Sequence, residues 1–108
     1  RFAITSLANG GNAGVVVGTN SFVEVSGPTA AFTLNGLNDS PNRDGHLVVI
    51  VNQTGYDMTV AHQSGVEPTA ANRIVSLTGA DRTSTGNGAA TFIYSAAASR
   101  WILTGFDP

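Results

Sequence analysis

Short apolar runs separated by turn-forming residues fill this chain. The clearest alternation lies at 30–34, where Ala30, Phe32 and Leu34 share one face of a predicted strand. The strongest apolar run, at 47–51, carries Val or Ile at four successive positions after Leu47. A strand that is apolar on both faces is either central in a sheet or has one face on the core and the other on a neighbouring subunit.

The pattern predicts an all-β fold. No segment keeps a helical period over the ~10 residues that a stable helix needs. About eight or nine strands follow one another at spacings of roughly 8–12 residues, as in a sandwich or a barrel. They are expected at 2–7, 15–17, 22–25, 30–34, 47–51, 57–62, 73–77, 89–95 and 100–106. We therefore predict a single domain over 1–108, an antiparallel sandwich or jelly-roll-like fold.

The longest interruption of the pattern is predicted to be an exposed loop. It covers 35–45, which is rich in Asn, Asp, Ser, Pro and Gly and shows no periodicity. At the start of the chain, Arg1 is an unusual first residue, which predicts that a further segment precedes it.

Composition changes this picture in one respect, since it favours an oligomer. Charged residues make up 11% of the chain, against roughly a quarter in an ordinary domain. Lys is absent, and all five cations are Arg. Isolated small domains use charge to stay soluble and to protect sheet edges, so part of this surface is expected to be buried against sister subunits.

The same numbers argue against several functional classes. The net charge of −2 gives no basic footprint for nucleic acid. The chain has no Cys, hence no thiolate metal site or disulfide. No apolar run approaches the ~20 residues that span a bilayer. We predict no cofactor, no nucleic-acid partner and no membrane partner.

Large apolar side chains on the predicted strands are the candidates for packing. They would carry either the core of the domain or the contact between subunits, and the sequence does not separate the two. These residues are Phe22, Phe32, Val49, Val51, Trp101 and Ile102.

No catalytic or metal-binding constellation emerges. His62, Ser64 and Asp57 contain the residue types of a hydrolase triad, but the Gly-x-Ser-x-Gly turn is absent. A metal site drawn from the His, Asp and Glu residues has no recognised ligand spacing. We predict no catalytic residues and no metal ligands.

Several strand sequences resemble the small β-domains of tailed-bacteriophage virion proteins. They include Phe-Thr-Leu-Asn-Gly at 32–36, Leu-Val-Val-Ile-Val-Asn-Gln-Thr at 47–54 and Met-Thr-Val-Ala-His at 58–62. The most specific are Asn-Arg-Ile at 72–74 and the stretch from Tyr94 to Trp101, within a likeness that covers roughly residues 20 to 106. Such domains occur in tail fibres, head fibres and capsid decoration proteins.

The resemblance implies a non-enzymatic structural protein on the exterior of the virion. It implies a homotrimer whose other partners are virion proteins such as the major capsid protein. The chain lacks a repetitive shaft, which favours a decoration or head-fibre protein over a tail-fibre tip. The alternative is a receptor-binding tip or a carbohydrate-binding module, in which Tyr56, Asp57 and Trp101 would contact host glycan.

Overall fold

The chain folds into an all-β domain in which short strands surround one core. The computed structural model describes the backbone of residues 2–108 and the side chains of residues 4–108. Within that range the strands are β1 (Phe2–Ser6), β2 (Gly10–Asn12), β3 (Val15–Val16), β4 (Phe22–Ser26), β5 (Phe32–Leu34), β6 (Leu37–Asn38), β7 (Leu47–Asn52), β8 (Met58–Val60), β9 (Ile74–Ser76), β10 (Arg82–Thr83), β11 (Gly88–Ser95) and β12 (Arg100–Asp107). A single turn of 3-10 helix, η1 (Ala70–Asn72), lies between β8 and β9.

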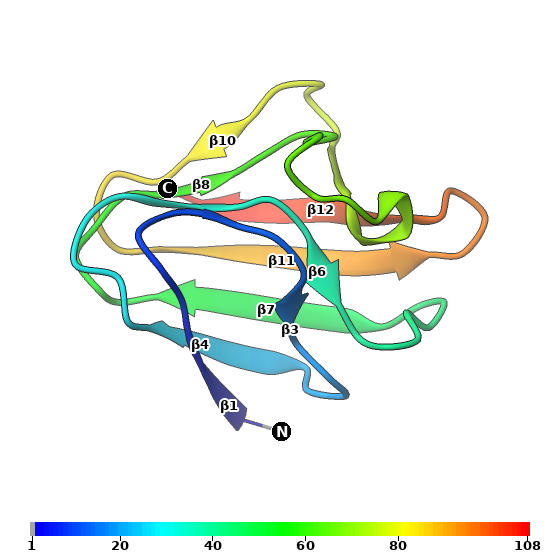
Figure 1. Cartoon of the computed structure of the whole chain (residues 1–108), viewed down its shortest axis with the longest axis horizontal. Coiled ribbons are helices and arrows are strands. Elements are labelled where there is room, and N and C mark those ends of the chain that lie inside the picture. Colours follow the sequence, from blue (N-terminus) through cyan, green and yellow to red (C-terminus); the bar gives the residue numbers. More distant parts are fainter. Residues whose placement is uncertain (1) are drawn as a thin grey trace.

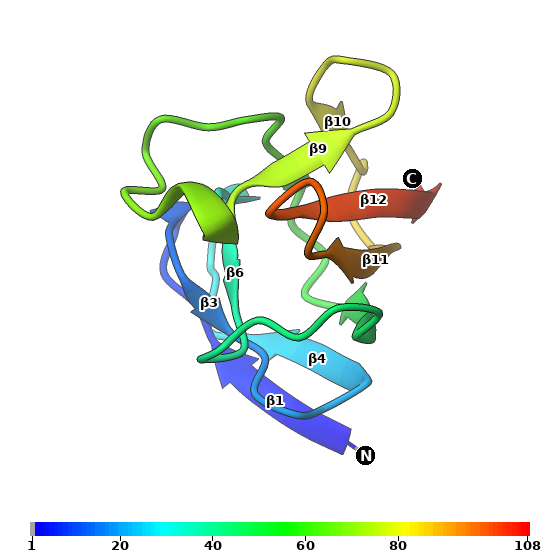
Figure 2. The same cartoon turned by 90° about the vertical axis from the view of Figure 1, so that its right-hand side faces the viewer.

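The first eight strands form a stack of coils in a solenoid-like arrangement. β1, β4 and β7 are parallel neighbours in one sheet, β2, β5 and β8 in a second, and β3 pairs with β6 in a third. A strand residue meets its partner in the next coil 20 to 27 positions later in the sequence. In Figure 2, β1 and β4 lie at the bottom of the view, and β3 and β6 rise above them on the left.

Antiparallel strands close the last coil. β11 pairs with β7 and with β12, so the first sheet has the order β1-β4-β7-β11-β12-β9. β10 pairs with β8 at the end of the second sheet. Figure 1 shows β4, β7, β11 and β12 running across the view one above another. The hairpin of β11 and β12 therefore covers the edge that β7 would otherwise leave open.

The all-β class is confirmed, but the predicted antiparallel sandwich or jelly roll is wrong. Six of the nine strand pairings within residues 2–108 are parallel. Twelve strands are present in that range instead of eight or nine. Alternation along a strand tells which side chains point inward, but it does not tell in which direction the partner strand runs.

Inward side chains of successive coils stack to form the core. Phe32 of β5 lies in register with Met58 of β8, and Leu34 lies in register with Val60. None of the four is more than 2% exposed. Burial of such side chains stabilises the fold by about 1.5–3 kcal/mol each.

The segment predicted as an exposed loop, 35–45, lies partly inside the molecule. It contains β6, and the side chain of Leu37 is 0% exposed. Leu37 pairs with Val15 of the preceding coil, which places this segment against the core. Its polar composition therefore reflects buried hydrogen bonds as well as solvent.

Among residues 2–108, no helix has the length and apolar character that crossing a membrane requires.

Candidate functional site

The residues predicted to pack divide between the interior and one outer surface. Phe32 and Trp101 are buried, with exposures of 2% and 0%. The other four are partly exposed and lie on the outward side of the six-stranded sheet: Phe22, Val49, Val51 and Ile102. The alternation of β7 shows that Val49 and Val51 point outward, because Val48 and Ile50 point inward and are both 0% exposed.

Strand register arranges these outward side chains in three rows across the sheet. We call this surface the outer sheet face. The first row is Val75, Ile102, Ile93 and Leu47, the second is Gly105, Thr91, Val49 and Phe22, and the third is Asp107, Ala89, Val51, Glu24 and Ile4. Each row crosses from strand to strand through paired positions, so apolar groups contact one another side by side.

The outer sheet face is poor in charge and has no cation in its three rows. Glu24 and Asp107 are the only ionisable side chains in these rows. Leu47 is 50% exposed and Ile4 is 62% exposed. When one face of a sheet packs on the core of an isolated domain, the other face is usually polar. Here the outer sheet face is largely apolar as well, which is the composition of a surface that another chain covers.

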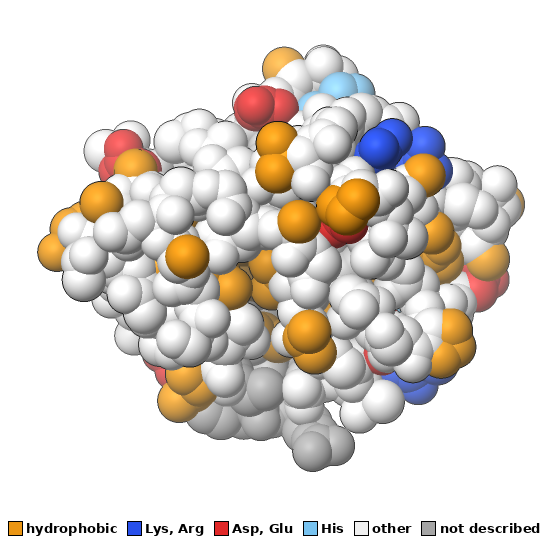
Figure 3. Space-filling view, viewed as in Figure 1, with side chains coloured by type: hydrophobic (Ala, Val, Ile, Leu, Met, Phe, Trp, Pro, Cys, Tyr) orange, Lys and Arg blue, Asp and Glu red, His pale blue; other side chains and the backbone are white. Residues whose placement is uncertain are grey.

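The opposite side of the molecule has a different character. Figure 3 shows that side, where β3 and β6 face the viewer as in Figure 1. Hydrophobic side chains are scattered there among uncharged polar groups and backbone, and few charged groups are visible. Scattered apolar residues are normal on a soluble surface.

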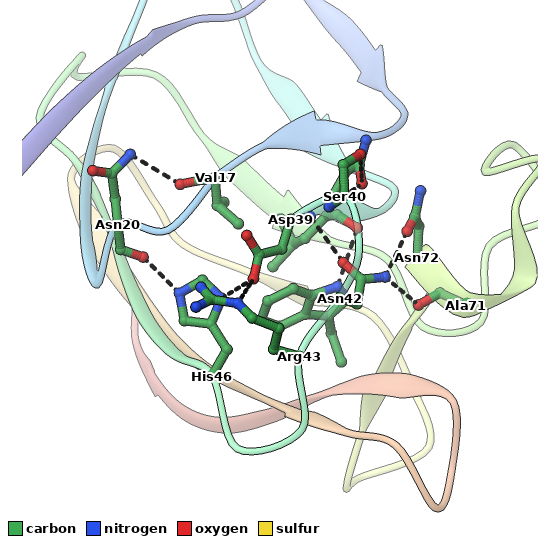
Figure 4. Close-up of polar contacts among 12 residues, drawn as sticks. Val17, Asn20, Asp39, Ser40, Asn42, Arg43, His46, Ala71 and Asn72 are labelled. Carbon is green, nitrogen blue, oxygen red and sulfur yellow. Dashed lines mark hydrogen bonds and ion pairs between the residues drawn. The ribbon is translucent and has the colours of Figure 1, made fainter.

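A second candidate is a buried ionic cluster beneath the 35–45 segment. Asp39 accepts hydrogen bonds from Nδ1 of His46, at 2.8 Å, and from Nε of Arg43, at 2.9 Å. The side chains of Asp39 and His46 are 1% and 7% exposed, whereas that of Arg43 is 52% exposed. Figure 4 shows the side chains of His46 and Arg43 converging on one carboxylate oxygen of Asp39. The cluster joins residues four and seven positions apart and fixes the shape of the segment.

The ring of His46 is held on both sides by acceptors. Its Nε2 lies 2.8 Å from the backbone oxygen of Asn20, in the turn that leads into the second coil. Both ring nitrogens therefore lie within hydrogen-bond distance of an oxygen acceptor. The ring also packs edge-on against Trp101, with centroids 5.5 Å apart. His46 thus ties the first coil, the 35–45 segment and the closing hairpin together.

Amide side chains extend the cluster toward η1. Asn42 donates through Nδ2 to the backbone oxygen of Ala71, at 3.1 Å, and to Oδ1 of Asn72, at 2.8 Å. Figure 4 shows Asn42 reaching across from the segment to these partners. A shallow surface groove beside them is bordered by Tyr94. Because these amides already bond to protein, we assign them to fold stability.

A buried carboxylate spans the coils at another corner. Glu67 is 2% exposed and accepts from the backbone N–H of Gly14 and from that of Thr69. Its side chain passes over the backbone of Gly36, where a Cβ atom would lie 2.6 Å from Cγ and Cδ of Glu67. The third coil therefore bonds directly to the first, and Gly36 leaves the space for this contact.

The residues predicted to contact glycan do not form a common platform. Trp101 is 0% exposed, and its Nε1 donates to the backbone oxygen of Leu37 at 3.1 Å. Its assignment as a glycan contact is wrong, because no face of the ring reaches the surface. Tyr56 is 41% exposed. The neighbouring Asp57 is exposed, but its Oδ1 accepts from the backbone N–H of Gly86 at 2.8 Å.

The residue types of a hydrolase triad are used in structure. Nδ1 of His62 accepts from the backbone N–H of Ser76 at 3.0 Å, and Oγ of Ser64 accepts from Nδ2 of Asn35 at 3.0 Å. In the part of the chain that the structure describes, no three His, Cys, Asp or Glu side chains come together as metal ligands would.

Comparison with protein-family models and with curated protein sequences gives no match.

Sequence reasoning missed the buried roles of Asp39, His46 and Glu67. Asp39 and His46 lie in a stretch whose polar composition is typical of an exposed loop. Their spacing of seven residues follows from the path of this one segment, and no general motif encodes it. For Glu67, the signal was its isolation, because the stretch 58–72 contains no other Asp, Glu, Lys or Arg.

Proposed function

We propose that this protein is a non-enzymatic structural subunit of a bacteriophage virion, of the capsid-decoration or head-fibre type, on the exterior of the particle. It assembles as a homotrimer through the outer sheet face and contacts other virion proteins, such as the major capsid protein, through the rest of its surface. The observation that carries the proposal is the set of largely apolar, outward-facing rows on the six-stranded sheet, which contain no cation. The likeness of its strand sequences to phage virion β-domains supports the same assignment.

The size of the outer sheet face is sufficient for assembly. The three rows hold thirteen positions, on strands about 4.8 Å apart and in rows about 6.7 Å apart, and cover roughly 400 Å². Burying that area in each copy contributes on the order of 10 kcal/mol. Association costs about 4–15 kcal/mol, so burial of this face can balance most of that cost. In a closed trimer each face is shared between two neighbours.

Light scattering on the native protein and on two variants tests the assembly. The native species is expected at three times the 11.0 kDa of one chain. Val49→Lys and Val51→Lys place a charge in the middle of the outer sheet face, so they should give monomers. Leu77→Lys is the matched control, because Leu77 is 73% exposed and lies outside the three rows. It should leave the trimer intact.

Binding to virus particles tests the role. Native protein mixed with heads that lack it should co-sediment with them at a fixed ratio to the capsid protein, and the Val49→Lys variant should bind more weakly because it loses the avidity of the trimer. A native monomer that binds no particle would overturn the proposal.

Glycan recognition has less support in the geometry. With Trp101 buried, Tyr56 is the remaining aromatic of the predicted pair, and it is 41% exposed. Sugar sites depend on aromatic faces combined with free polar groups, and the Asp57 carboxylate beside it already bonds to Gly86. Binding on a glycan array that is lost in Tyr56→Ala would favour the receptor-binding alternative.

A further inference from the structure

The groove beside η1 is lined by uncharged side chains, most of them polar. Its volume is about 480 Å³, a size typical of sites that hold small molecules. The residues that line it come from the 35–45 segment, from η1 and the residue before it, and from Tyr94 of β11. None of these lining residues is Asp, Glu, Lys, Arg or His. A ligand in the groove would therefore be recognised through hydrogen bonds and packing.

The amides that join the 35–45 segment to η1 stabilise the fold, but one of their NH2 groups remains unused. The backbone N–H of Asp39 donates to Oδ1 of Asn42 at 2.8 Å, so Nδ2 of Asn42 is turned toward η1. There it donates to the backbone oxygen of Ala71 and to Oδ1 of Asn72, which leaves Nδ2 of Asn72 on the far side of that amide. Figure 4 shows this nitrogen directed away from Asn42.

Two nearly buried side chains bring free polar groups to the groove. Asn72 is 9% exposed and Tyr94 is 6% exposed, yet among residues 4–108 no group bonds to Nδ2 of Asn72 or to Oη of Tyr94. In that range the one enclosed side-chain polar atom without a partner is Oδ1 of Asn20, so the two free groups are open to the groove that their residues line. Nearly buried donors are seldom left without a partner, which indicates that the partner comes from outside the chain.

The shape of the groove is fixed from behind. The ring of Tyr94 packs edge to face against Trp101, with centroids 5.2 Å apart, and its backbone N–H donates to the backbone oxygen of His46 at 3.0 Å. His46 in turn bonds to Asp39, which directly precedes the groove residue Ser40. A ligand therefore meets groups that are already oriented, which lowers the entropic cost of binding.

The free groups match an uncharged ligand that carries several hydroxyls. Nδ2 of Asn72 can only donate, whereas the hydroxyls of Tyr94 and Thr69 can donate or accept. An ionic ligand would find no counter-charge in the lining and would lose hydration without compensation. We propose that the groove binds a neutral sugar unit, whose hydroxyls bond to these three groups and whose C–H face packs on Pro41.

This site is separate from the surfaces already described. None of its lining residues belongs to the rows of the outer sheet face, and Tyr56 is not among them. The inference is therefore independent of the virion role and of the glycan contact predicted at Tyr56.

An NMR titration with glucose, galactose and N-acetylglucosamine as probes tests the site. At least one of these sugars should shift the side-chain NH2 signals of Asn72 in isotope-labelled native protein and give a saturable curve. Tyr94→Phe and Thr69→Val each remove one hydroxyl, so each should raise Kd about five-fold. The matched control is Tyr56→Phe, which removes the hydroxyl of a tyrosine outside the groove and should leave Kd unchanged.

The variants and a charged probe make the test decisive. Trp101 emission reports whether each variant is folded, and Thr69→Val, at an exposed position, carries the comparison if Tyr94→Phe is not. Unshifted Asn72 signals with all three sugars at about 10 mM, or an equal rise of Kd in Tyr56→Phe and the groove variants, would overturn the inference. A stronger response to glucuronic acid than to glucose would also overturn it. None of these outcomes depends on the mass measured by light scattering, so the assembly is tested separately.

Discussion

At the residue scale, Gly36 is needed because the side chain of Glu67 occupies the space beside its Cα. The carboxylate has two backbone N–H partners, on Gly14 and Thr69, and is 2% exposed. A methyl group at residue 36 would displace it from both. A buried carboxylate that loses its partners is among the most costly changes in a small domain.

Gly36→Ala is therefore expected to lower the free energy of unfolding by about 3 kcal/mol. The matched control is Gly65→Ala, where a Cβ would meet no atom within 4 Å. That variant should change stability by less than about 0.5 kcal/mol. Urea denaturation followed by fluorescence measures both. Equal stabilities of the two variants would show that Glu67 can move without cost.

The two partners of Asp39 are expected to contribute unequally. His46→Gln leaves a carboxylate that is 1% exposed without its buried donor, so we predict a loss of about 2–4 kcal/mol. Arg43→Gln removes a donor that is 52% exposed, and solvent screening limits its cost to about 1 kcal/mol or less. Urea denaturation of each variant gives its free energy of unfolding and shows which substitution costs more. A larger loss for Arg43→Gln would contradict the assignment of His46 as the main partner.

At the scale of elements, the closing hairpin depends on Trp101. The residue pairs with Tyr94 across β11 and β12, and their rings pack edge to face with centroids 5.2 Å apart. Its indole N–H bonds to Leu37 in the second coil. The hairpin is thereby fixed to a strand distant in sequence, as well as to its neighbour β7.

Trp101 is the only tryptophan, so its fluorescence reports on the hairpin. Native emission should be blue-shifted and resistant to acrylamide, because the ring is 0% exposed. Trp101→Phe keeps an aromatic ring but leaves the Leu37 carbonyl without its donor, and should cost about 1–3 kcal/mol. Far-UV circular dichroism during urea denaturation measures that cost. Native emission at the wavelength of the unfolded chain would contradict the burial of Trp101.

Element positions were largely predictable from the sequence, whereas their pairing was not. At 47–51 the continuous apolar run predicted a strand with two apolar faces, and the structure places Val48 and Ile50 inward and Val49 outward. The two partners of one strand lie at unequal separations along the sequence, because Phe22 pairs with Phe2, 20 positions earlier, and with Val49, 27 positions later. Coils of unequal length give no repeat in the sequence, so a local pattern could not reveal a solenoid.

At the scale of the whole molecule, the outer sheet face is a surface that the fold does not use. It lies along the side of the coils, and its three rows carry two carboxylates and no cation. The hairpin of β11 and β12 covers the edge of β7 and leaves this face uncovered.

Because the only charged side chains in the rows of the outer sheet face are the carboxylates of Glu24 and Asp107, assembly of this protein through that face should not depend on ionic pairs. Sedimentation velocity at about 0.02 M and 1 M NaCl should give the same mass, since screening acts only on charged contacts. Sodium sulfate should strengthen assembly by favouring burial of apolar surface. Dissociation at 1 M NaCl would instead point to cations beside the outer sheet face, such as Arg73 and Arg100 next to its first row, as the residues that hold the copies together.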